Sequence, residues 1–342
     1  MNHSYILTRK QFSRTQVMKF FKVILFVCFS YLTVESACWK TLNPGDEIAL
    51  IAPSSKPTSQ AIETIKDRIA AQGYLPVVYY DESASAEFGR SATREARRDA
   101  LLCALRSDAK VIWSLRGGKS GLFRDPGLFE EFHTMSPKLL IGFSDFTAIH
   151  LWANSIGWPS LHGIVASFCL ENNQSVNAQT SIAPYFDILS GRTQELVYTL
   201  ICENDSARSQ NIEESSIIGG NLSLIQRAMG TLRQPDTHGN ILILEDIGEP
   251  GRKIDEALSQ LAEASLLDGV AAVIWGKFSG DASEQANITS AKNLLKKDLD
   301  ERRIPFFSAD CFGHDPLNMP LPFGTPARIA SGGRLTVKTN NA

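Results

Sequence analysis

The sequence has 342 residues, of which 43% are hydrophobic, and a formal net charge of -3. This length and composition predict a globular protein with room for two modest domains. The balanced charge, with no basic run outside the N-terminus, argues against nucleic acid as a partner. The six cysteines form no C-x-x-C pair, which argues against a zinc site and, in a chain this long, against a disulfide framework.

The first 37 residues differ in character from the rest. From Met18, a short basic segment precedes an apolar run over residues 20–34, and the small residues Ser36 and Ala37 follow. This order is typical of a secretory signal peptide, and the apolar run is short for a transmembrane span. We therefore expect residues 1–37 to be a signal peptide, with Met18 as an alternative start of the chain.

The same segment predicts where the protein works. Once the signal is removed, we expect a secreted, periplasmic protein without a stable membrane anchor. Cys38 raises the alternative of a lipoprotein, but Glu35 stands where such a signal has an apolar residue. If the segment is not a functional signal, the protein is cytoplasmic.

Strands and helices alternate in the first part of the mature chain. Residues 46–55 are expected to form a buried strand that ends in a small-residue turn, and the elements after it are a helix over 59–73, a strand over 74–80, a helix over 91–107, a strand over 110–115, a helix near 126–135 and a strand over 139–141. Strand, helix, strand at this spacing predicts a parallel sheet. The repeats predict a doubly wound domain over residues 38–170, with ligands at the C-terminal ends of its strands.

The pattern weakens over residues 171–215, which are polar and are expected to be a linker. Residues 216–342 then predict a second α/β domain, with a helix that ends near Gly230, strands over 240–246, 270–276 and 305–308, and helices over 252–267 and 288–302.

Ser144 lies in a strand-to-helix turn, because an apolar run stops at Gly142 and a helical pattern begins at Asp145. In such a turn the serine hydroxyl can project from the end of the sheet while the following backbone N–H groups point at the same space. The alternative is that Ser144 is only the N-cap of the helix. This stretch alone favours the cap.

A serine nucleophile needs a base, and the base needs a carboxylate that orients it. A buried strand delivers Glu245 and Asp246 at its end, and either could be that carboxylate. Among the six histidines, His162 and His314 remain once those in helical, polar or pre-signal surroundings are set aside. An α/β-hydrolase would share the order serine, acid, histidine. However, the strand-to-helix turn that carries its nucleophile, the nucleophile elbow, needs a small residue two positions after the serine, and Phe146 stands there. A different scaffold is therefore expected.

The turn over residues 116–121 places Gly117 and Gly118 side by side, which exposes backbone N–H groups as in an oxyanion or phosphate nest. Lys119 and Ser120 look like the end of a Walker A motif, but the spacing of that motif is absent. Nucleotide binding is not expected.

Six ordered motifs over nearly the whole mature chain resemble the LD-carboxypeptidase family, serine peptidases that include muramoyltetrapeptide carboxypeptidases and microcin C self-immunity proteins. The motifs are Arg116-Gly-Gly118, Ile141-Gly-Phe-Ser-Asp-Phe-Thr-Ala-Ile-His150, His162-Gly163, Gly219-Gly-Asn-Leu222, Leu244-Glu-Asp-Ile-Gly-Glu-Pro250 with Ile254-Asp255, and Phe312-Gly-His314 with Asn318, Pro320 and Gly324.

The resemblance implies an N-terminal parallel-sheet domain like the class I glutamine amidotransferases, which are flavodoxin-like, and a C-terminal mixed α/β domain, with the active site at their interface. It also implies Ser144 as the nucleophile, Glu245 as the acid that orients the histidine, and His314 as the general base. The backbone N–H groups of Gly118 and Asp145 would form the oxyanion hole. The family works without a metal or cofactor and suggests a homodimer.

The implied activity is release of a C-terminal D-amino acid from an L,D-peptide bond, typically D-Ala from a murein tetrapeptide during peptidoglycan recycling or remodelling. The chain departs from the family at Lys119-Ser120-Gly121, where Tyr-Gly is usual, and at Gly251-Arg252-Lys253, where Pro-Tyr-Arg is usual. Both changes add positive charge beside the expected cleft. Arg116, Lys119 and Arg252 are therefore candidate substrate-binding residues.

Two alternatives follow from the same observations. The resemblance also admits a self-immunity type of serine hydrolase. A signal peptide followed by two α/β lobes would, in addition, fit a non-catalytic periplasmic solute-binding protein, which binds its ligand reversibly without turnover.

Overall fold

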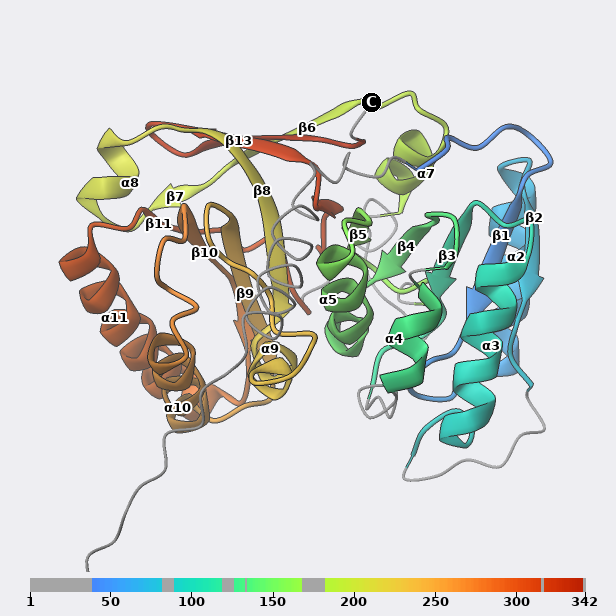
Figure 1. Ribbon diagram of the computed structural model, residues 1–342, viewed down its shortest axis with the longest axis horizontal. Helices are drawn as coiled ribbons and strands as arrows, with labels where there is room; N and C mark the ends of the chain where they lie inside the picture. Colours follow the sequence, from blue (N-terminus) through green and yellow to red (C-terminus); the bar gives the residue numbers. More distant parts are fainter. Residues whose placement is uncertain are drawn as a thin grey trace, which may run out of the picture. The chain divides into compact units, whose positions relative to one another are not determined.

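The computed structural model describes residues 39–81, 89–118, 126–132, 134–167, 182–314 and 317–340. The expected signal peptide and Cys38 lie outside these ranges. The described chain forms a six-stranded sheet and an eight-stranded sheet (Figure 1). Within the described residues, every helix is too short or too polar to span a bilayer.

The first sheet has the strand order β12-β5-β4-β3-β1-β2. Its strands are β1 (Glu47–Ile51), β2 (Leu75–Val78), β3 (Val111–Ser114), β4 (Leu139–Gly142), β5 (Ser160–His162) and β12 (Leu321–Phe323). Strands β1 to β5 are parallel, as predicted, and β12 joins β5 antiparallel. The helices of this half are α2 (Ser59–Ala71), α3 (Arg94–Arg106), α4 (Pro126–Phe132), α5 (Thr147–Ser155) and α7 (Ala183–Leu189).

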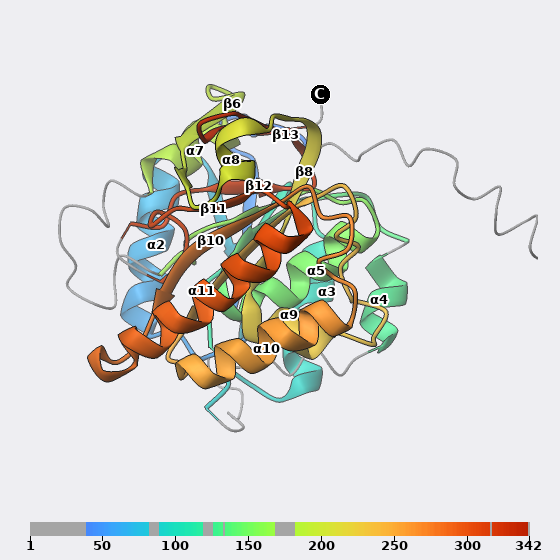
Figure 2. The same ribbon diagram turned by 90° about the vertical axis from the view of Figure 1, so that its left-hand side faces the viewer.

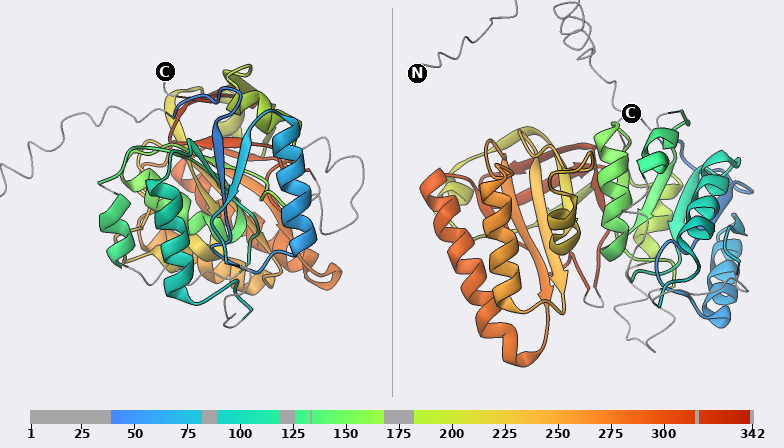
Figure 3. Two further views of the ribbon diagram at one scale, coloured as in Figure 1. Left: turned by 90° about the vertical axis from the view of Figure 1, so that its right-hand side faces the viewer. Right: turned by 60° about the horizontal axis from the view of Figure 1, so that its bottom comes forward.

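Helices cover both faces of the first sheet, because successive residues of each strand point to opposite sides (Figure 3). On one side Ile48 and Trp113 pack with apolar residues of α2 and α7. On the other side Ala49 and Ile112 pack with α3, α4 and α5. This two-sided burial explains why the strands are continuous apolar runs.

The second sheet has the order β6-β14-β13-β8-β9-β10-β11-β7. Its strands are β6 (Glu195–Thr199), β7 (Ile201–Cys202), β8 (Ile212–Asn221), β9 (Ile241–Ile247), β10 (Ala272–Ser279), β11 (Phe306–Ser308), β13 (Pro326–Ala330) and β14 (Arg334–Lys338). Strands β8 to β11 are parallel and the outer strands are antiparallel, so the sheet is mixed.

Helices pack on one face of the parallel strands in this half (Figure 2). They are α9 (Leu222–Ala228), α10 (Gly251–Glu263) and α11 (Gln285–Arg302), and α8 (Asp205–Ser209) lies near β7 and β11. Leu242 and Val273 belong to the core under the three helices, whereas Ile243 shares the core of the opposite face with Ile329 of β13 and Leu335 of β14.

Two segments differ from the sequence expectations. The described part of the expected linker, residues 171–215, contains α7, β6, β7 and α8, and its strands pair with β14 and β11. Strand β6 has no fully buried residue, which is why it looked like a polar connection. In addition, β12 from the expected C-terminal domain closes the edge of the first sheet beside β5. Closing a sheet edge in this way satisfies its backbone hydrogen-bonding groups.

Candidate active site

Ser144 follows β4 after one residue, Phe143, and is the first residue of a 3-10 turn, η2 (Ser144–Phe146), that leads into α5. Its φ of +60° is in the left-handed region, which is strained for a residue other than glycine and is common at functional sites. Gly142 makes the tight turn possible, since a Cβ there would lie 2.5 Å from Cγ of Phe146. The N-cap positions of η2 and α5 belong to Phe143 and Phe146, so Ser144 is not the helix cap.

Glu245 and His314 form a close pair. Nδ1 of His314 lies 2.8 Å from Oε2 of Glu245, and the two side chains are 10% and 0% exposed. The His314 ring also packs on Phe143, with 4.8 Å between ring centroids. Because Nδ1 faces the carboxylate, Nε2 on the other side of the ring is the nitrogen left for proton transfer.

The loop that carries His314 is held through its backbone by β10 and by the side chain of Asn318. Lys277 of β10 donates its N–H to the Phe312 carbonyl at 2.7 Å, and Gly313 donates its N–H to Oδ1 of the buried Asn318 at 3.2 Å. Gly313 has a φ of +140°, and a Cβ there would lie 2.8 Å from Cβ of Lys277. These contacts explain why Phe312-Gly-His314 and Asn318 occur together.

Asp246, the alternative acid, is engaged elsewhere. Its Oδ1 accepts from Nδ2 of Asn221 at 2.9 Å, and its Oδ2 accepts from both the N–H and the hydroxyl of Ser223. Asn221 in turn donates its N–H to the Thr147 hydroxyl at 3.0 Å. Asp246 therefore orders the start of α9 against α5, and Glu245 is the carboxylate that reaches His314.

Gly118 lies on the wall beside Ser144. It has a φ of +135°, and a Cβ there would lie 1.8 Å from Oγ of Ser55, so only glycine fits. Ser55 donates its N–H to the Gly117 carbonyl at 3.1 Å, and Ser54 donates its hydroxyl to Asp145 at 2.6 Å. The loop after β1 thus supports the glycine turn and the residue after Ser144 together.

A cavity of about 480 Å³ brings these groups together. Its walls contain Ser144, His314, Gly118 and Asp246 along with residues that the sequence analysis did not single out, namely Ser55, Phe143, Val165, Ser167, Asn221, Ser223, Leu224, Arg227, Ile247 and Glu249. Four of these, Phe143, Asn221, Ile247 and Glu249, fall inside the quoted motifs, which could have pointed to them. Arg227 lies on α9 outside any motif.

The three candidate substrate-binding residues have different positions. Arg116 lines the cavity and donates to the Lys56 carbonyl at 3.0 Å. Lys119 lies outside the described residues. Arg252 does not line the cavity; it is exposed on α10 and pairs with Glu256. Among the described residues, the positive charges on the cavity wall therefore come from Arg116 and Arg227.

The electrostatics favour an ionised Glu245. Burial by itself would raise its pKa, but the charge of His314 and the contacts with His314 and His162 outweigh burial and lower the pKa to about 2. Asp246 shows the opposite shift, because burial and the adjacent charge of Glu245 raise its pKa. Glu245 is thus a permanent negative charge beside His314 at neutral pH.

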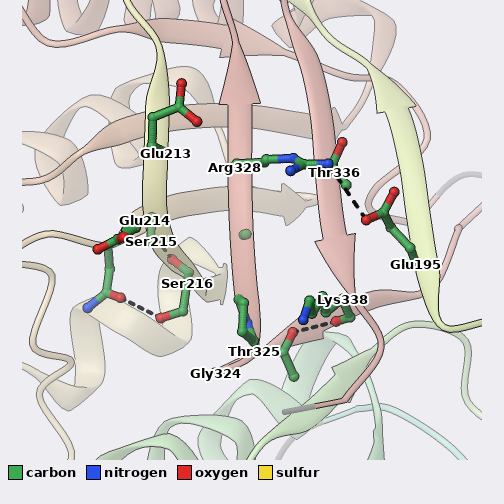
Figure 4. Close-up of a pocket in the computed structure, with 13 residues that line it drawn as sticks. Glu195, Glu213, Glu214, Ser215, Ser216, Gly324, Thr325, Arg328, Thr336 and Lys338 are labelled. Atoms are coloured by element: carbon green, nitrogen blue, oxygen red, sulfur yellow. Dashed lines mark hydrogen bonds and ion pairs between the residues drawn. The ribbon is translucent and has the colours of Figure 1, made fainter. Parts of the chain in front are cut away.

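A larger cavity, of about 600 Å³, lies over β6, β8, β13 and β14 (Figure 4). Glu213, Glu195 and Arg328 border it, and three of its hydroxyl groups donate hydrogen bonds: Ser215 to the Gly239 carbonyl, Ser216 to Oδ1 of Asn240 and Thr325 to the Lys338 carbonyl. Its described lining residues include no histidine and no cysteine, so nothing among them resembles a nucleophile with a base. Within the described ranges, no three His, Cys, Asp or Glu side chains are grouped so as to hold a metal ion.

Two stretches of the chain match the domains of a known protein family. Residues 48–163 match the LD-carboxypeptidase N-terminal domain and residues 214–329 match the LD-carboxypeptidase C-terminal domain. A Rickettsia prowazekii protein, provisionally named a carboxypeptidase, is 33% identical over 234 residues, covering 68% of this chain and 70% of that protein. The murein tetrapeptide carboxypeptidase of Pseudomonas aeruginosa is 29% identical over 315 residues, covering 89% of this chain and 99% of that protein.

Solved structures show the same fold. The muramoyltetrapeptide carboxypeptidase of Oxalobacter formigenes superimposes with a TM-score of 0.70 at 24% identity, covering 85% of this chain and 97% of that chain. MccF in complex with glutamyl sulfamoyl guanosine superimposes with a TM-score of 0.74 at 20% identity, covering 88% of this chain and 98% of that chain.

Proposed function

This chain belongs to the LD-carboxypeptidase family, and we propose that it is a serine carboxypeptidase that removes the terminal D-Ala from murein tetrapeptides. The observation that supports the proposal most directly is the 2.8 Å contact between Glu245 and His314, with His314 and Ser144 on the wall of one cavity. These three groups come from both halves of the chain.

The proposed mechanism uses this geometry. His314 takes the proton of the Ser144 hydroxyl through Nε2 as the oxygen attacks the carbonyl carbon of the L,D-peptide bond. Glu245, ionised and in contact with Nδ1, stabilises the imidazolium that forms. The backbone N–H groups of Gly118 and Asp145 stabilise the oxyanion, where each donor contributes roughly 3 to 4 kcal/mol of barrier lowering. His314 then gives the proton to the leaving amine, and water hydrolyses the acyl-enzyme.

The experiment offers the purified mature protein two substrates, a murein tetrapeptide and an acyl-sulfamoyl adenylate. We expect release of D-Ala from the tetrapeptide and little cleavage of the adenylate. Preferential cleavage of the adenylate would instead assign the protein to the self-immunity type of activity. Binding of the tetrapeptide without turnover, and without labelling of Ser144 by a serine-reactive probe, would indicate a binding protein.

Arg227 is our candidate for binding the terminal carboxylate of the substrate. It lines the cavity and, among the described residues, has no hydrogen-bond or ion-pair partner. We expect Arg227→Met to raise KM for the tetrapeptide by about tenfold or more with kcat little changed, because a charge-assisted contact is lost equally from ground and transition states. Arg252→Met is the matched control, and its KM should match the wild type. Steady-state kinetics would contradict this assignment if Arg252→Met, and not Arg227→Met, raised KM.

We also propose that the enzyme acts in the periplasm after removal of residues 1–37, on the basis of the sequence pattern of that segment. N-terminal sequencing of the protein made in its native host should find a mature start near Ala37 or Cys38. A protein that keeps Met1 or Met18 would contradict a secretory signal.

A further inference from the structure

His162, at the end of β5, faces the carboxylate oxygen of Glu245 that His314 does not contact. Its Nε2 is 3.9 Å from Oε1 of Glu245, and both side chains are 0% exposed. His162 belongs to the strand beside β4, where its register partner is Gly142, whereas Glu245 belongs to the second sheet. The contact therefore joins the half of the chain that carries Ser144 to the half that carries the acid and the base.

The polar atoms at this contact are unusual. Within the described residues, neither ring nitrogen of His162 has a hydrogen-bond partner. Neither carboxylate oxygen of Glu245 has one either, although Oε2 lies 2.8 Å from Nδ1 of His314. Buried polar atoms are nearly always satisfied, and catalytic hydrogen bonds in free enzymes are often long and shorten when substrate binds. A gap of 3.9 Å is too long for a hydrogen bond, but closing it would satisfy a donor and an acceptor together.

The surroundings argue against packing as the whole role of His162. Its ring stacks on Phe323, with 5.2 Å between centroids, and meets Phe143 edge-on at 6.3 Å. A phenylalanine would fill this apolar space without burying two nitrogens. The neighbouring His150 shows the contrast, since its nitrogens contact the Ser160 hydroxyl and the Gly142 carbonyl at 2.9 and 2.8 Å.

We propose that His162 is a positioning residue, whose Nε2–H holds Oε1 of Glu245, directly or through one water, so that Oε2 stays aimed at His314. The proposal rests on the proposed function in assuming that Glu245 and His314 act on Ser144. When His162 makes this contact, each carboxylate oxygen of Glu245 accepts a hydrogen bond from a different histidine. The carboxylate is then fixed in rotation, and His314 keeps the orientation that presents Nε2 toward Ser144.

Among the described residues, the titratable groups around this contact include His314, which faces the other oxygen of Glu245. Asp246 adjoins Glu245 on β9, His150 of α5 is 5.9 Å from His162 between ring centroids, and Lys277 of β10 lies near Asp310. Burial, followed by the charge of His162, lowers the pKa of His150 to about 3, so His150 stays neutral. Loss of the His162 donor leaves more of the negative charge of Glu245 facing His314. The imidazolium of His314 is then better stabilised. The acid limb of the pH–activity profile, where activity falls as the base is protonated, should therefore move to higher pH.

Two substitutions at His162 separate positioning from packing. His162→Phe keeps a ring against Phe323 and removes the donor, whereas His162→Gln keeps an N–H near the position of Nε2. We expect His162→Phe to lower kcat and the rate of Ser144 labelling by a fluorophosphonate probe by about tenfold or more, with KM nearly unchanged. We expect its acid limb to shift upward, and His162→Gln to recover most of the rate and the wild-type limb.

Phe323→Leu is the packing control. It should lower the thermal unfolding temperature and leave the acid limb in place. If the wild type neither hydrolyses the tetrapeptide nor reacts with the probe, the proposed function fails. If the wild type does both and His162→Phe matches its rate and pH profile, the positioning role is overturned. A Phe323→Leu variant that reproduced the kinetic effects of His162→Phe would also overturn it, because packing alone would then explain them.

Discussion

Ser144→Ala is expected to reduce kcat for D-Ala release by a factor on the order of 10⁴ to 10⁶, because it removes the hydroxyl that forms the acyl-enzyme. The fold should be retained. The φ of +60° at this position is as unfavourable for alanine as for serine, so the substitution leaves the strain of the turn unchanged. Steady-state kinetics on the tetrapeptide and labelling by a fluorophosphonate probe measure the loss.

Ser155→Ala is the matched control for this variant. Ser155 ends α5, the helix that follows the elbow, and its hydroxyl donates to the Trp152 carbonyl at 2.8 Å. Its substitution should leave both the kinetics and the labelling near wild type. Retained turnover in a well-folded Ser144→Ala protein would remove Ser144 as the nucleophile and with it the whole serine mechanism.

Glu245→Gln is expected to lower kcat about 10³- to 10⁴-fold while the protein stays folded, because an amide cannot stabilise the imidazolium of His314. In the wild type the pKa of Glu245 is lowered to about 2, so the carboxylate stays ionised and the acid limb of kcat/KM reports His314. Without the carboxylate the pKa of His314 should fall. The acid limb of the residual activity should then move to lower pH.

The same substitution should change how stability depends on pH. A carboxylate whose pKa is lowered on folding contributes stability that is present above its ordinary pKa of 4.5, and this contribution is lost as the pH falls toward 2. The wild type should therefore lose folding free energy between about pH 4.5 and 2 that Glu245→Gln does not lose. Chemical denaturation at pH 7 and pH 3 measures the difference.

Asp246→Asn distinguishes the two adjacent carboxylates. Asp246 is buried but contacts Asn221 and Ser223 rather than His314. Its substitution should lower stability and leave the acid limb where it is in the wild type. If Asp246→Asn moved the limb and Glu245→Gln did not, the assignment of Glu245 as the orienting acid would be contradicted.

The alternating pattern of apolar strands and amphipathic helices was readable in the sequence. Runs such as Leu139–Ile141 are buried on both faces, and α2 ends at Ala71, two residues before Gly73. Such features depend on local periodicity and turn chemistry, so the parallel sheet and the mixed α/β class could be predicted. Strands β6 and β13 could not, because their residues alternate with exposed positions and their partners β14 and β8 are distant in sequence.

The residue types of the site could be named from the sequence, and the family resemblance implied how they pair, but the residues alone left that pairing open. From the residues alone, Glu245 and Asp246 were equivalent strand-end carboxylates, as His162 and His314 were equivalent candidates for the base. Only the tertiary structure places Glu245 2.8 Å from His314 and engages Asp246 with Asn221 and Ser223. Successive residues of a strand face opposite sides, so which carboxylate reaches the histidine depends on how β9 is oriented in the fold.

By itself, the sequence determined the α/β class, the family and the chemical groups available for catalysis, because motif identity and periodicity are local properties. The tertiary structure decided three things that depend on contacts distant in sequence. It showed that Ser144 adopts a strained left-handed conformation rather than capping a helix. It placed Arg227, and not Arg252, on the cavity wall. It also set His162 against Glu245 across the two sheets, where the distance between side chains, and not their spacing in the chain, decides what they can do.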